Sequence, residues 1–165
     1  MLYKSSVSNS ILSVTFLFSL SLLLLSNYCR IPIPGIAAPI TLQTLCIITT
    51  SLLLPQHIAS KTMVSYFLLT LTIFNPHGAF VIPTSIGYIM GMAMAAYLGI
   101  QFRGVMNMPK LILIQYCLPL AMGSLVLSTS MGLSKAFFIG FYPFIFVEVL
   151  KALLTHQVLC FLKHK

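Results

Sequence analysis

The chain has 165 residues, of which 59% are hydrophobic and only 6% are charged, and its mean hydropathy is +1.04. This composition excludes an ordinary soluble domain, which needs far more surface charge. The net charge is +8, but the nine basic residues are scattered singly, so the basic cluster of a nucleic-acid-binding protein is missing. We therefore expect a protein whose main solvent is lipid.

Long apolar stretches separated by short polar or proline-containing connections predict six transmembrane helices. They are expected at about 10–27, 37–54, 57–74, 82–101, 110–131 and 137–162. The predicted fold class is an all-α integral membrane bundle that forms one domain over residues 1–165. No G-x-x-x-x-G-K-[ST] sequence occurs, so we expect no ATP hydrolysis through a P-loop.

The first apolar stretch also resembles the hydrophobic region of a secretory signal peptide, and we favour an uncleaved helix. The positions of the cations then orient the bundle. With a cytoplasmic N-terminus, six cations lie inside, namely Lys4, Lys61, Arg103, Lys110, Lys163 and Lys165, and two lie outside, Arg30 and Lys135. Because cytoplasmic loops carry the excess of Lys and Arg, both termini are expected inside, in a multi-pass protein of the cell membrane.

Glu148 is the single acidic residue of the chain, and it lies within the last predicted helix. Lys151 follows three residues later and falls on the same helical face. A charge at membrane depth costs roughly 2.5–3.5 kcal/mol on insertion scales, so an intramembrane carboxylate indicates a functional site. The alternative is a structural ion pair, although replacing such a pair by apolar residues is often neutral for stability.

Two further segments place polar groups beside helix breaks at the predicted outer face. The first enters the second helix through several prolines and carries Thr41, Gln43 and Thr44. The second opens the fourth helix, where Tyr88 lies between glycines at 87 and 91 whose four-residue spacing permits close helix packing. The alternatives are that Thr41 and Gln43 only join neighbouring helices, and that Tyr88 is an interfacial aromatic residue.

Other chemistry is poorly supported by the sequence. The four cysteines form no C-x-x-C pair and are expected to be buried apolar residues, and the four histidines lack metal-ligand spacing. One carboxylate excludes a mechanism based on an acid pair, and no nucleophile–base arrangement is visible. We expect neither an enzyme nor a resident cofactor or metal.

The run IPIPGIAAPITLQTL at 31–45 closely resembles the signature of the BioY family, the biotin-binding S components of energy-coupling-factor (ECF) transporters. The run PFIFVEVLKA at 143–152 resembles the family's P-F-x-x-G-D-x-x-K-A element, with Glu148 in place of the aspartate. The run IGYIMG at 86–91 resembles its G-P-T-G-G-Y-L-x-G element. The three resemblances span nearly the whole chain in the family's order.

This resemblance implies an S-component fold, biotin as the ligand, and partners that supply a transmembrane coupling subunit and ATPase subunits. Glu148 is suited to accept from the ureido N–H groups of biotin, and the amides of Gln43 and Asn75 both donate and accept. The candidate binding residues are Glu148, Lys151, Gln43, Thr41, Tyr88 and Asn75. Two alternatives remain, namely a carrier for another small vitamin and a non-transporting membrane scaffold subunit.

Overall fold

The computed structural model describes residues 9–26, 28–31, 40–73 and 86–163. Within these residues there are seven helices and one two-stranded ribbon. The elements are α1 (Asn9–Ser26), β1 (Arg30–Ile31), β2 (Ile40–Thr41), α2 (Gln43–Leu53), α3 (Gln56–Ile73), α4 (Ile86–Phe102), α5 (Met108–Met131), α6 (Leu133–Gly140) and α7 (Tyr142–Lys163). The predicted all-helical character is confirmed, apart from the short ribbon.

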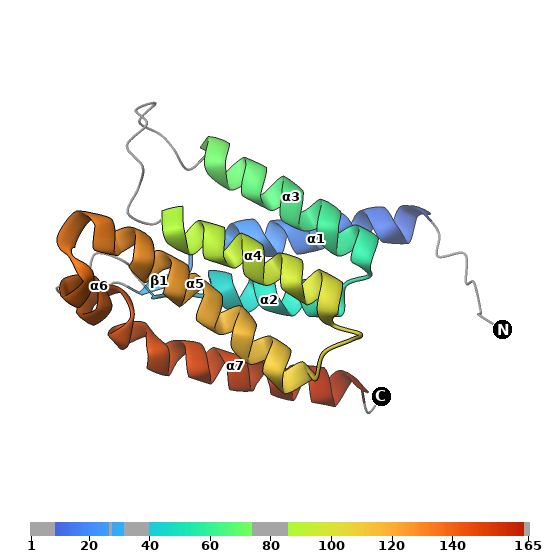
Figure 1. Ribbon diagram of the computed structural model, residues 1–165. Coiled ribbons are helices and arrows are strands. Elements are labelled where there is room, and N and C mark those ends of the chain that lie inside the picture. The colour runs from blue at the N-terminus through green and yellow to red at the C-terminus, as the bar shows by residue number, and fades with distance from the viewer. Residues whose placement is uncertain (1–8, 27, 32–39, 74–85, 164–165) are drawn as a thin grey trace.

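The long helices lie side by side in one bundle (Figure 1). Helices α1, α3 and α5 run in one direction, and α2, α4 and α7 run in the other. The short helix α6 lies at the end where α2, α4 and α7 begin, which we call the α6 end. Both ends of the described chain, the start of α1 and the end of α7, lie at the opposite end of the bundle.

The prediction of a single last helix over 137–162 is wrong, because two helices occupy this region. Gly132, with a positive φ of 83°, ends α5, and α6 follows it directly. The break between α6 and α7 falls at Phe141, two residues before Pro143. Proline has no N–H to donate to the carbonyl four residues earlier, and its ring clashes there, so it fits without cost in the first turn of a helix, where Pro143 lies, and is disfavoured in a helix interior.

The second helix begins at Gln43 rather than at residue 37. The two residues before Leu42 instead form β2, which pairs antiparallel with β1 in the register Arg30↔Thr41 and Ile31↔Ile40. The other predicted helices differ from the observed ones at their ends. Pro55 separates α2 from α3, because a residue before proline avoids the helical region, and Leu54 is extended (φ −76°, ψ 150°).

Helix α2 is the central element of the bundle, because it contributes to both clusters of buried side chains. Ile47 packs with residues of α1, α3 and α4, including the fully buried Leu23 and Tyr66. Ile48 packs with residues of α5 and α7, including Leu111. Side chains at the start of α2 are therefore held between the two halves of the bundle.

Glycines allow α4 and α5 to approach closely, as their spacing predicts. A Cβ atom added at Gly91 would lie 2.8 Å from the carbonyl oxygen of Leu118 and would also meet the backbone of Pro119. One added at Gly87 would lie 2.7 Å from the Cβ of Val126. The absence of side chains at these two positions lets the backbones pack together.

Large apolar side chains cover much of the outer surface of the bundle. Phe18 is 71% exposed, Phe146 is 70% exposed and Leu153 is 56% exposed. Soluble monomeric proteins rarely expose so much apolar surface. By length and composition, two helical segments among the described residues are long and apolar enough to cross a membrane, Met108–Met131 and Tyr142–Leu162. Shorter apolar helices cover Leu12–Ser26, Gln43–Leu53 and Ile86–Phe102.

Candidate functional site: a buried ion pair at the start of the central helix

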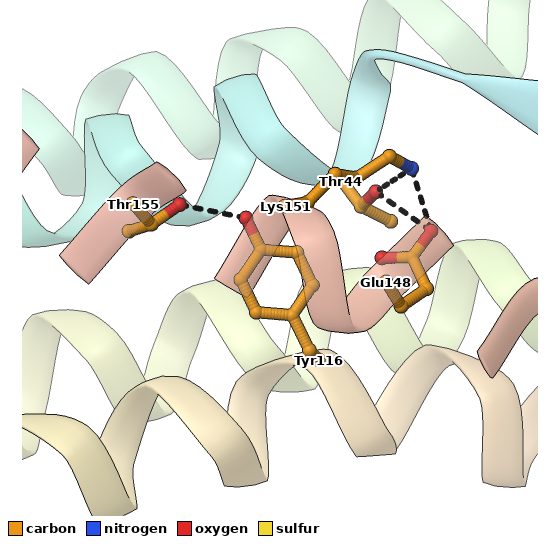
Figure 2. Close-up of polar contacts among 5 residues, drawn as sticks. All are labelled: Thr44, Tyr116, Glu148, Lys151 and Thr155. Atoms are coloured by element: carbon orange, nitrogen blue, oxygen red, sulfur yellow. Dashed lines mark hydrogen bonds and ion pairs between the residues drawn. The ribbon is translucent and has the colours of Figure 1, made fainter. Parts of the chain in front are cut away.

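Glu148 and Lys151 form a buried ion pair on the inward face of α7. The Nζ atom of Lys151 lies 2.6 Å from Oε1 of Glu148. Glu148 is only 7% exposed and Lys151 only 5% exposed. Their three-residue spacing places both on one side of α7, as the sequence predicts, and this side faces α2 (Figure 2).

Thr44, in the first turn of α2, joins the two charges (Figure 2). Its hydroxyl accepts a hydrogen bond of 2.8 Å from Nζ of Lys151 and donates one of 3.3 Å to Oε1 of Glu148. Thr44 is itself 8% exposed. The cluster therefore links α7 to the central helix across more than 100 residues of sequence.

One oxygen of this carboxylate has no partner among the described residues. Oε1 of Glu148 receives both hydrogen bonds, whereas Oε2 is buried and receives none. A buried acceptor without a partner costs about 1–3 kcal/mol, and more when it is charged. The ammonium of Lys151 has three donors, and its described contacts use two of them. Among the described residues, the cluster therefore leaves one carboxylate oxygen without a hydrogen-bond donor.

A second polar group lies further along the same face of α7. Thr155 is fully buried, and its hydroxyl lies 2.8 Å from that of Tyr116 on α5 (Figure 2). It also lies 3.5 Å from the hydroxyl of Thr49. The completely buried Gln115 donates to Ser51 Oγ at 3.1 Å and to the carbonyl of residue 95 at 2.8 Å. Neither Thr155 nor Gln115 was predicted from the sequence as a buried polar residue. The position of Gln115 inside an apolar helix was a signal that could have identified it.

The other predicted site residues are more dispersed. Gln43 is part-buried, and its amide donates to the hydroxyl of Tyr66 on α3. Thr41 lies in β2 and pairs with β1. Tyr88 donates a hydrogen bond of 2.6 Å to the carbonyl of Gly140, so it holds α6 against α4. Asn75 lies outside the described residues.

A cavity of about 550 Å³ lies away from the ion pair, between α5 and α6. Neither Glu148 nor Lys151 lines it. Its lining is almost entirely apolar and includes three phenylalanines from α6 and the break after it. This cavity does not provide the charges that a polar vitamin needs.

The fold and the site together define a class, namely a helical bundle with an apolar exterior and one buried, incompletely bonded ion pair. This arrangement suits capture of a small polar molecule, since such sites combine an apolar surround with a few placed polar groups. The sequence profile described as the BioY family matches residues 3–164, and the chain belongs to that family.

A solved structure supports the same fold. It is described as the crystal structure of the S-component for biotin from an ECF-type ABC transporter. The superposition gives a TM-score of 0.75 and covers 97% of this chain and 96% of that one, at 18% sequence identity. No curated protein matches the chain with significance.

Proposed function

We propose that this protein is a membrane substrate-capture component for biotin uptake, which binds biotin in an outward-facing pocket and delivers it inward with an ECF energising module. Membership of the BioY family and the similarity in fold to a biotin S-component support this function. The observation that carries it is the unpartnered Oε2 of Glu148 in a buried ion pair. A polar guest would complete the hydrogen bonding that the protein leaves incomplete.

The ureido ring of biotin matches the free positions of the cluster. It carries two N–H donors and one carbonyl acceptor, held in a plane. An N–H group would donate to Oε2 of Glu148, and the carbonyl would accept from the third donor of Lys151. Each charge-assisted bond contributes about 1.5–3 kcal/mol, which is about 10- to 150-fold in Kd.

The remaining predicted residues have supporting roles in this proposal. Gln43 and Asn75 would contact the polar groups of the ligand. Thr41, in β2, lies two residues before Gln43 and would contact the ligand beside it. Tyr88 packs edge-on against Phe144 of α7, with ring centroids 6.4 Å apart, so its ring would shape the apolar side of the pocket. The resident ligand would be biotin, with no cofactor.

We further propose a multi-pass protein of the cell membrane with both termini in the cytoplasm. The arrangement of the bundle supports this, because both ends of the described chain lie at the same end (Figure 1). In this orientation the α6 end, where α2 and α7 begin, faces outward. Energy would come from ATPase subunits through a transmembrane coupling subunit.

Binding of radiolabelled biotin to the purified protein tests the proposal, with unlabelled desthiobiotin and thiamine as competitors. We expect saturable binding that biotin and desthiobiotin displace and thiamine does not. Saturable binding of radiolabelled thiamine without saturable binding of biotin would identify a carrier for another vitamin, and the absence of saturable binding of either vitamin is the result that a scaffold subunit predicts. Either result would overturn the assignment to biotin.

A further inference from the structure

The cavity between α5 and α6 is a second place where a molecule could bind. Its lining consists of Ala121, Ser124, Leu125, Leu133, Ser134, Phe137, Phe138 and Phe141. The cavity opens to the surface of the bundle, since Leu133 is 73% exposed and Phe138 is 68% exposed. Its volume of about 550 Å³ falls in the range of roughly 300–1,000 Å³ that is typical of small-molecule pockets.

The chemistry of the lining favours hydrocarbon. No charged side chain lines the cavity, and the two hydroxyls belong to Ser124 and Ser134. The Ser124 hydroxyl already donates to the carbonyl of Leu120, 2.8 Å away in its own helix. A polar guest would lose its hydrogen bonds to water and gain almost none here, which is unfavourable. An acyl chain makes no hydrogen bonds to water, so it has none to lose when it enters the cavity.

A cation lies beside this apolar cavity. Lys135 follows Ser134 in α6 and is exposed. Two other exposed cations that the structure describes, Lys61 and Lys110, and the half-buried Arg103 lie at the opposite end, where α3 begins and α4 and α5 meet (Figure 1). Among the described side chains, Lys135 is therefore the surface cation at the α6 end.

We propose that the α5–α6 cavity binds an acyl chain of an anionic phospholipid, whose headgroup phosphate pairs with Lys135. The short helix α6 then lies in the membrane interface with its phenylalanines toward the acyl chains, as amphipathic interfacial helices do. This lipid site shares no residue with the Glu148–Lys151 cluster. One lysine near an anionic headgroup supports a preference of about fivefold over a neutral lipid.

The absence of tryptophan from the sequence permits a direct test. A tryptophan introduced by Phe138→Trp reports on the cavity, and one introduced by Phe146→Trp, at an exposed position of α7, is the matched control. Each variant is reconstituted in bilayers that contain brominated phosphatidylglycerol or brominated phosphatidylcholine, and the quenching of tryptophan fluorescence is measured. We expect an approximately fivefold preference for phosphatidylglycerol at position 138 and none at position 146.

A second substitution tests the role of the cation. Lys135→Gln in the Phe138→Trp background should abolish the preference, whereas Lys110→Gln, at the opposite end, should leave it unchanged. Leu125→Trp on α5 is a second reporter of the same cavity, should the first variant fail to fold. Equal quenching by both lipids at positions 138 and 125, or a preference that survives Lys135→Gln, would overturn the proposal. If the cavity binds a protein partner instead of a lipid, quenching by the two lipids should be equal.

Discussion

The buried ion pair gives a prediction that separates binding from stability. Lys151→Met leaves Glu148 buried without its cation, and Glu148→Leu leaves Lys151 without its anion. Loss of one member of a buried pair costs about 3–5 kcal/mol. In either variant the hydroxyl of Thr44 remains as a hydrogen-bond partner of the charge that is left. We therefore expect a loss of stability at the lower end of this range, about 3 kcal/mol. For a chain of this size that is about 6–12 °C in Tm.

The double variant should behave differently. With both charges replaced by apolar side chains of similar size, nothing charged stays buried, and the stability should return to within about 1 kcal/mol of the wild type. Biotin binding should remain absent, since the hydrogen-bonding groups are gone. The assay is thermal unfolding in detergent, followed by circular dichroism, beside a biotin-binding measurement on the same samples. A double variant that is as unstable as the single variants, or that still binds biotin, would refute the reasoning.

Three further predictions concern the scaffold. Gly91→Ala should destabilise the protein by about 1–3 kcal/mol in chemical unfolding, because the added Cβ meets the backbone of α5, whereas Gly104→Ala, in open space, should change stability by less than about 0.5 kcal/mol. Arg103→Met removes the guanidinium that donates to the carbonyl of Leu54 after α2, so Tm should fall by several degrees more than with Lys110→Met at the same end. A tag at either terminus should react with a membrane-impermeant reagent only after the cytoplasmic side is exposed; labelling of intact cells would contradict the proposed topology.

Much of the fold could be predicted from the sequence, because an apolar solvent leaves helices as the main solution for the backbone. The errors arose where local chemistry competes with hydropathy. Pro143 divides the last apolar stretch into two helices, and the strand Ile40–Thr41 lies within the range predicted for the second helix. Hydropathy averages over about 20 residues and does not detect such breaks.

The candidate site was predictable in part, for a similar reason. The contact between Glu148 and Lys151 follows from their spacing on one helix and is confirmed. The bridging role of Thr44 depends on how α2 is rotated against α7, which no local pattern specifies. The buried amide of Gln115 and its bonds to α2 and α4 depend in the same way on packing between distant segments. Whether Gln43, Thr41, Tyr88 and Asn75 contact a ligand stays a prediction.

The most direct test of the proposed function is the biotin affinity of Glu148→Gln, measured by titration calorimetry on the purified protein. This change keeps the shape of the side chain and removes its charge. We expect the Kd to rise at least about tenfold, because the ligand loses a charge-assisted hydrogen bond at Oε2. Thr155→Val, two turns further along the same face of α7, is the matched control and should change the Kd by less than about twofold. An unchanged Kd for Glu148→Gln would contradict a biotin site at this carboxylate.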